Sequence, residues 1–127
     1  MRYLSQDIER TLTQEKKMAF IAGPRQVGKT TFAQTLLKKV HSEHGYYNWD
    51  IEAHRATLLK DPTYFWKKPP LPQRLVLDEI HKYPRWKRFL KGFFDANRGQ
   101  VEVIVTGSGR LDLYQKGGDS LFGRYHR

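Results

Sequence analysis

The sequence predicts an α/β fold with a mostly parallel sheet, and two observations support this prediction. Short apolar runs recur at residues 18–22, 75–77 and 101–105, as expected of strands that are buried on both faces. Segments with apolar residues at helical spacing separate these runs. Strands that alternate with helices are typical of layered α/β domains, and 127 residues suit one domain, residues 1–127.

Composition narrows the class of protein. The chain has 39% hydrophobic and 28% charged residues, which is ordinary for a soluble globular protein. No apolar run approaches the ~18 residues of a membrane span, and the first residues lack the pattern of a signal peptide. We therefore expect a cytoplasmic protein. The absence of cysteine excludes disulfides, thiolate metal sites and a cysteine nucleophile.

The net charge of +10 is concentrated in one segment. Residues 66–91 carry eight Lys or Arg and two Asp or Glu, so this segment supplies +6. A segment of this kind is expected either to contact nucleic acid or an acidic partner, or to form a solvated helix face.

The first expected element is a short helix over residues 5–14. Leu4, Ile8 and Leu12 recur every four residues with polar residues between them, and Ser5 is a suitable N-cap. Residues 18–22 then form the first strand, which leads into a glycine-rich segment.

Residues 23–31, GPRQVGKTT, fit the pattern G-x-x-x-x-G-K-[ST]. The glycines let backbone N–H groups close around phosphate oxygens, Lys29 would reach the β- and γ-phosphates, and the Thr30 hydroxyl would meet Mg²⁺. A helix that begins at Gly28 adds its unpaired amides to the same phosphate. We predict that this segment binds a nucleoside triphosphate, the alternative being a turn with a surface lysine. The predicted contacts are Gly23, Pro24, Arg25, Gln26, Val27, Gly28, Lys29, Thr30 and Thr31.

The next elements follow from periodicity. An amphipathic helix should run to about His41, since apolar residues recur every four positions: Phe32, Leu36 and Val40. The aromatic run of residues 46–49 is expected to form the second strand, with Asp50 as the N-cap of a helix after it. Asp61 and Pro62 should begin a further helical turn.

The third strand, residues 75–77, ends in an acidic pair, Asp78 and Glu79. Ligands of open α/β sheets bind outside the carboxyl ends of the strands, so this pair and Lys29 should converge. Asp78 would hold Mg²⁺, and Glu79 would act as general base on the attacking water. The alternative is that the pair caps the strand end or forms salt bridges with nearby lysines.

A helix should follow Pro84 and stop at Gly99. Its apolar stripe follows one helix face, which favours core packing over base stacking, and consists of Trp86, Phe89, Leu90, Phe93 and Phe94. The opposite side carries cations that would either be solvated or contact nucleic acid: Arg85, Lys87, Arg88 and Lys91.

The fourth strand, residues 101–105, leads into Thr106 and Ser108. Either hydroxyl could sense the γ-phosphate and orient water at the strand end, or Ser108 could instead cap a helix over residues 110–116. Arg124 follows that helix. It is a candidate to neutralise transition-state charge, in its own subunit or a neighbour's, or it is an ordinary surface arginine.

Three blocks together carry a family resemblance. GPRQVGKTT, LVLDEIHKYP and VIVTGSGRLDLYQKGGDSLFGR resemble prokaryotic AAA-type P-loop ATPases, in which a C-terminal domain of uncharacterised role normally follows the ATPase domain. The resemblance implies a three-layer P-loop NTPase fold with sheet order 5-1-4-3-2. It also implies Walker A at residues 23–30, Walker B at Asp78 and Glu79, a sensor within residues 106–108, and a functional arginine at Arg124.

Family members continue through a fifth strand and a second domain beyond the point that corresponds to Arg127. From the resemblance we expect a truncated domain without the fifth strand, which would leave the first strand at an exposed edge. The expected function is binding of ATP with Mg²⁺ and its hydrolysis, with a homo-oligomer or a protein partner possible. The alternative is a nucleotide-dependent binding switch, on DNA through residues 66–91, with little turnover. A small-molecule kinase is less favoured because Glu79 directly follows Asp78.

Overall fold

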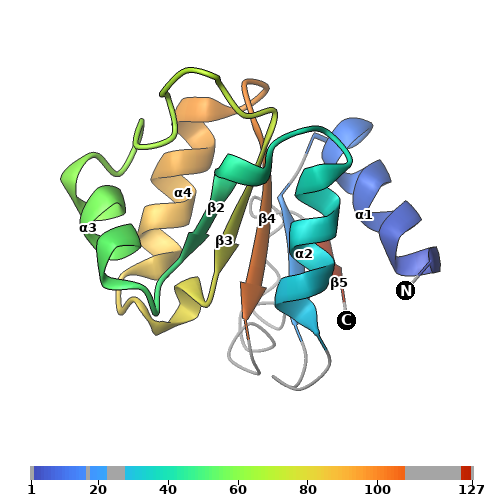
Figure 1. Ribbon diagram of the computed structural model, residues 1–127, viewed down its shortest axis with the longest axis horizontal. Coiled ribbons are helices and arrows are strands. Elements are labelled where there is room, and N and C mark those ends of the chain that lie inside the picture. The colour runs from blue at the N-terminus through green and yellow to red at the C-terminus, as the bar shows by residue number, and fades with distance from the viewer. Residues whose placement is uncertain (1, 17, 23–27, 108–123, 127) are drawn as a thin grey trace.

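The protein is a three-layer α/β domain (Figure 1). The computed structural model describes residues 2–16, 18–22, 28–107 and 124–126. Within them, five strands form one sheet. Helices α1 and α2 pack against one face of the sheet, and α3 and α4 pack against the other face (Figure 1). This architecture confirms the α/β class predicted from the apolar runs.

The sheet has the order β2-β3-β4-β1-β5, and each pair of neighbouring strands is parallel. This order is the 5-1-4-3-2 arrangement that the family resemblance implies. Parallel strands end at a common edge, so the last residues of β1, β3 and β4 lie at the same edge of the sheet. The strands are β1 (Ala19–Ala22), β2 (Tyr46–Asn48), β3 (Arg74–Asp78), β4 (Glu102–Gly107) and β5 (Arg124–His126).

The expectation that the fifth strand is missing is wrong. β5 pairs with β1 in parallel, Ala19 opposite Arg124 and Ile21 opposite His126. β1 therefore lies between β4 and β5, because residues 124–126 supply the backbone groups that pair its second edge. A strand of three residues that contains Arg and His has no apolar run to reveal it in the sequence.

Helices and short 3₁₀ turns connect the strands. They are α1 (Arg2–Thr13), α2 (Lys29–Lys38), η2 (Glu43–Gly45), α3 (Glu52–Lys60), η3 (Ile80–Lys82) and α4 (Trp86–Asn97). Residues 61–66 form turns, in which the Phe65 amide donates to the Asp61 carbonyl. Among the described helices, none is both long and apolar enough to span a membrane.

The predictions of Ser5 and Asp50 as helix N-caps are wrong. α1 begins at Arg2, so Ser5 lies inside the helix, where its hydroxyl oxygen accepts a hydrogen bond from Lys39 Nζ at 2.8 Å. α3 has Ile51 as its N-cap, and Asp50 lies one residue before it. The aspartate instead pairs with Lys82, a partner remote in sequence that no local capping pattern reveals.

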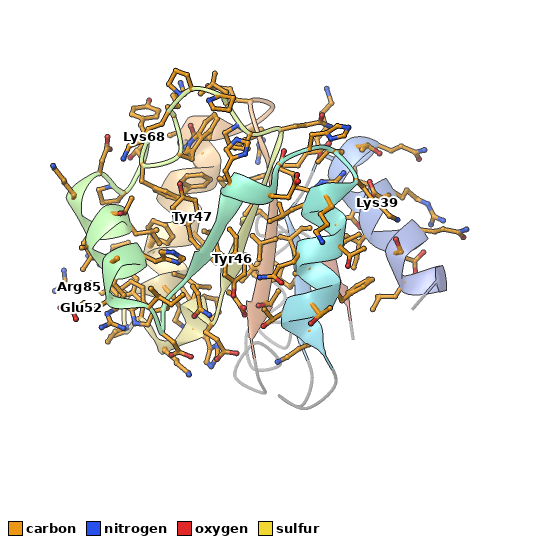
Figure 2. All side chains as sticks on the ribbon, in the orientation of Figure 1. Lys39, Tyr46, Tyr47, Glu52, Lys68 and Arg85 are labelled. Carbon is orange, nitrogen blue, oxygen red and sulfur yellow. The ribbon has the colours of Figure 1, made fainter. Side chains whose placement is uncertain are left out.

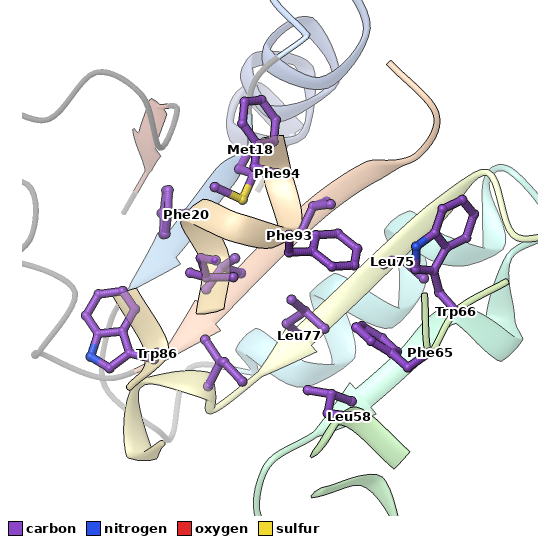
Figure 3. Close-up of a cluster of buried hydrophobic side chains, with 14 residues drawn as sticks. Met18, Phe20, Leu58, Phe65, Trp66, Leu75, Leu77, Trp86, Phe93 and Phe94 are labelled. Carbon is purple, nitrogen blue, oxygen red and sulfur yellow. The ribbon is translucent and has the colours of Figure 1, made fainter. Parts of the chain in front are cut away.

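Alternate residues of the buried strands face opposite layers. Ile21, Val76 and Ile104 share a cluster with Leu36 and Leu37 of α2 and with Ile8 and Leu12 of α1. Their neighbours point the other way and pack with α4, as Figure 3 shows for Phe20, Leu77 and Phe93. The predicted aromatic stripe is confirmed as core: Trp86, Leu90, Phe93 and Phe94 are buried, and Phe89 is partly buried.

Arg74 joins three elements at the amino end of the sheet. Its guanidinium donates to Glu9 of α1 at 2.7 and 2.9 Å, to Glu102 of β4 at 2.9 Å, and to the Leu36 carbonyl of α2 at 2.9 Å. Burial opposes its charge, but the hydrogen bonds to the two glutamates outweigh burial and raise the pKa of Arg74 above its ordinary value. With 1% of its surface exposed, Arg74 is a structural clamp rather than part of a charged surface.

Candidate functional site

The start of α2 depends on the backbone of Gly28. This residue is the N-cap, with φ 71° and ψ 30°, a left-handed conformation that glycine adopts without a steric penalty. The next residue, Lys29, is the first of α2. The predicted phosphate contacts Gly23, Pro24, Arg25, Gln26 and Val27 lie outside the described residues. Thr31 lies in the first turn of α2 and is exposed.

Lys29 is held at the carboxyl edge of the sheet. Its side chain is buried, and Nζ donates a hydrogen bond of 2.6 Å to the carbonyl oxygen of Gly107, the last residue of β4. A buried ammonium is costly unless polar partners surround it. The structure thus places a cation beside the ends of the central strands, where the sequence predicts phosphate.

The carboxylate of Asp78 is the centre of a hydrogen-bond cluster. Thr30 donates to Oδ2 at 2.8 Å, Tyr46 donates to the same oxygen at 2.6 Å, and Thr106 donates to Oδ1. Asp78 is 2% exposed, and these hydroxyl donors satisfy its oxygens without supplying a positive charge. The arrangement leaves a buried acidic group that suits a cation.

Tyr46 was not predicted as a site residue. Burial, and then the hydrogen bond that Tyr46 donates to Asp78, raise the pKa of its hydroxyl above the ordinary value. Asn48 Nδ2 donates to the Tyr46 oxygen at 3.0 Å. In Figure 2, Tyr46 lies between β2 and α2, whereas Tyr47 belongs to the cluster on the opposite face. The aromatic second strand beside the acidic strand was the signal that could have suggested it.

A pocket of about 230 Å³ opens at this edge of the sheet. Its lining combines an ammonium, a hydroxyl, an amide and three carboxylates, from Lys29, Thr30, Asn48, Asp50, Asp78 and Glu79. Asn48 is the last residue of β2 and Asp50 lies in the turn after it, and sequence reasoning did not connect either residue with the site. The lining is polar, and it suits a charged ligand accompanied by a cation.

Glu79 has an unusual backbone conformation. Its φ of 60° and ψ of 25° are left-handed, which costs a residue with a side chain roughly 1–2 kcal/mol. The Glu79 amide donates to the Thr106 carbonyl at 3.0 Å. Its Oε2 is buried, has no hydrogen-bond partner among the described residues, and lies 3.4 Å from Lys82 Nζ and 3.6 Å from His81 Nε2.

The described residues contain no cluster of three His, Asp or Glu side chains that could hold a metal ion unaided. The Asp78 carboxylate and the Thr30 hydroxyl are hard oxygen ligands, however, and they fit Mg²⁺. This ion commonly takes one or two protein ligands and completes its shell with water and phosphate oxygens. The residues present therefore suit a magnesium ion that arrives with a phosphate ligand.

The structure brings together five of the predicted site residues: Lys29, Thr30, Asp78, Glu79 and Thr106. Ser108 lies outside the described residues. Arg124 begins β5, and its Cα pairs with Ala19 at the amino end of β1, whereas the pocket lies at the carboxyl end. The described residues thus do not place the backbone of Arg124 at the pocket of its own chain.

Two of the eight cations in the basic segment, residues 66–91, form ion pairs with carboxylates of the protein. Arg74 is buried, and Lys82 forms ion pairs with Asp50 and Glu79. Lys68 and Arg85 lie at opposite ends of the region around α4 (Figure 2). The exposed cations of the segment are Lys67, Lys68, Arg85, Lys87, Arg88 and Lys91.

Comparison with known proteins identifies the family. A search of curated proteins finds no match to this chain. The model of a family described as an AAA domain matches residues 15–127, a range that contains each residue of the pocket. A match over most of the chain shows membership, and it agrees with the fold and with nucleotide binding. The chain belongs to the AAA domain family.

Proposed function

We propose that this domain binds ATP with Mg²⁺ and hydrolyses it. The observation that carries the proposal is the 2.8 Å hydrogen bond from Thr30 to Asp78. These groups lie 48 residues apart in the sequence, and they are the two protein ligand types that P-loop NTPases use for Mg²⁺. Lys29 lines the same pocket. A cation that can bind phosphate therefore lies close to the oxygen atoms that can bind a metal ion.

In this proposal each residue of the pocket has a separate task in binding. Lys29 binds the β- and γ-phosphate oxygens, together with backbone amides of residues 23–31. Thr30 and Asp78 hold Mg²⁺, while Tyr46 and Thr106 keep the Asp78 carboxylate in place. The bound ion would offset the charge that builds on the phosphate oxygens.

In the proposed hydrolysis, Glu79 is the general base. Its carboxylate accepts a proton from water while the water oxygen bonds to the γ-phosphorus and the bond to the β–γ bridging oxygen breaks, which yields ADP and phosphate. Thr106 and Ser108 are the proposed residues that orient the water. Arg124 is proposed to stabilise the developing charge; action on a neighbouring subunit would require a homo-oligomer.

The first experiment measures ATP binding by isothermal titration calorimetry in the presence of Mg²⁺. Lys29→Ala should weaken binding by about 100-fold or more, the size expected when a charged phosphate contact is lost. Lys38→Ala, an exposed lysine of the same helix, is the matched control and should bind like wild type. Unchanged binding by a folded Lys29→Ala protein would refute the phosphate site.

The second experiment separates hydrolysis from the rival function, a binding switch with little turnover. Glu79→Gln should retain ATP binding and lose phosphate release by about 100-fold or more, because the amide cannot accept the proton. Phosphate release is measured at saturating ATP and Mg²⁺. A wild-type chain that binds ATP without releasing phosphate would support the switch.

A further inference from the structure

Lys82 connects two carboxylates at the rim of the pocket. It is the last residue of η3, and its Nζ lies 2.8 and 2.9 Å from the two carboxylate oxygens of Asp50. The same nitrogen lies 3.4 Å from Oε2 of Glu79. Asp50 follows β2 and Glu79 follows β3, so one ammonium spans the ends of neighbouring strands.

The two ion pairs differ in length and in exposure. The contact with Asp50 is short and involves both carboxylate oxygens, but the Asp50 side chain is 49% exposed. The contact with Glu79 is longer, and the Glu79 side chain is only 11% exposed. Charges attract more strongly where solvent is excluded. Asp50 thus anchors the lysine, while the lysine acts on the buried glutamate.

Glu79 has few other restraints on its side chain. Among the described residues, its buried Oε2 accepts no hydrogen bond, and His81 Nε2, at 3.6 Å, is the other charged or titratable neighbour that contacts this oxygen. Without the ammonium, Oε2 would lose the nearer of the two nitrogen atoms that contact it. The ammonium thus contacts the buried oxygen of the carboxylate, and through it sets the orientation of the whole group.

We propose that Lys82 is a positioning residue that holds the Glu79 carboxylate, and that Asp50 keeps Lys82 in place. The proposal rests on the role of Glu79 in the proposed hydrolysis. It assigns a function to the end of β2, which lines the pocket through Asp50.

The kinetic test uses the full chain and compares turnover with ATP affinity. Lys82→Met should lower kcat about tenfold and leave the Kd for ATP with Mg²⁺ within about threefold, since it misplaces a base without removing a phosphate contact. Lys82→Arg should restore most of kcat, because it keeps the cation. Lys91→Met, an exposed lysine of α4, is the control and should match wild type.

Asp50 is tested in a double-mutant cycle. Asp50→Asn should lower kcat less than Lys82→Met, and it should add no further loss in the Lys82→Met background, because it acts through the lysine. Full turnover in Lys82→Met would overturn the proposal. A loss of kcat matched by an equal loss of affinity, or full additivity with Asp50→Asn, would also overturn it.

A second readout does not require hydrolysis. The side-chain ammonium of Lys82 can be followed by ¹H–¹⁵N NMR and assigned by its absence in Lys82→Met. Its resonance should move in both Glu79→Gln and Asp50→Asn. A resonance unaffected by Glu79→Gln would refute the contact. If wild type binds ATP but releases no phosphate, the hydrolysis proposal fails, and the resonance alone then decides whether Lys82 holds Glu79.

Discussion

The hydroxyl of Thr30 donates a hydrogen bond of 2.8 Å to Oδ2 of Asp78, and this bond joins the first turn of α2 to the end of β3. Lys29 and Thr30 of the glycine-rich segment thereby line one pocket with the acidic pair. Asp78 receives further hydroxyl donors from Tyr46 and Thr106, so β2 and β4 also contribute to its position.

Replacing Thr30 by Val should remove the magnesium-dependent part of ATP affinity. The isosteric change deletes one proposed metal ligand and keeps Lys29, so the ratio of Kd values in EDTA and in Mg²⁺ should fall about tenfold. Calorimetry under both conditions gives this ratio. Thr35→Val, an exposed threonine of α2, is the control; an equal effect in that variant would argue against Thr30 as a metal ligand.

Arg74→Met should destabilise the fold by about 3 kcal/mol, because it removes the buried cation that the partly exposed Glu9 and Glu102 share. Urea unfolding measures the change in free energy. Glu9→Gln should cost less, since its side chain is 31% exposed and the pair is partly screened by solvent. Restoring neutrality with Glu9→Gln and Glu102→Gln should recover part of the stability of Arg74→Met, and a complete lack of recovery would contradict the clamp.

The free energy of unfolding should depend on pH in the alkaline range because of Tyr47. Burial raises the pKa of its hydroxyl from the ordinary value of 10.0. Below pH 10 both states hold the proton and the stability contribution is complete; above it the unfolded chain loses the proton first, so stability falls as pH rises. Tyr47→Phe should therefore lose less stability between about pH 9 and 11, measured by urea unfolding. Identical slopes in the two proteins would contradict the assignment.

Binding of DNA through residues 66–91 should be weak and sensitive to salt. Arg74 and Lys82 pair with carboxylates of the protein, and two of the exposed cations, Lys68 and Arg85, lie at opposite ends of the α4 region (Figure 2). We expect any shift of DNA mobility at low salt to disappear near ~0.15 M salt. A complex that survives this salt and is lost on replacement of Arg85, Lys87 and Arg88 by Ala would instead support the DNA-binding switch.

Local patterns were sufficient for much of the fold and for part of the pocket. Apolar runs predicted β1, β3 and β4, the stripe that begins at Trp86 predicted a core helix, and motif chemistry pointed to Lys29, Thr30 and Asp78. The predictions of strands and of the core helix succeed because burial on both faces of a strand and spacing along one helix face are properties of a few neighbouring residues.

The sequence by itself determined the α/β class and the chemistry at the ends of two strands, since both are encoded in short segments. Only the tertiary structure decided that β5 pairs with β1, that Arg74 is a buried clamp, that Tyr46 donates to Asp78, and that Asp50 lines the pocket and pairs with Lys82. These contacts join residues far apart in the chain, such as Tyr46 and Asp78 across a separation of 32 positions. Strand order and register set them, and neither property can be read from the periodicity of one segment.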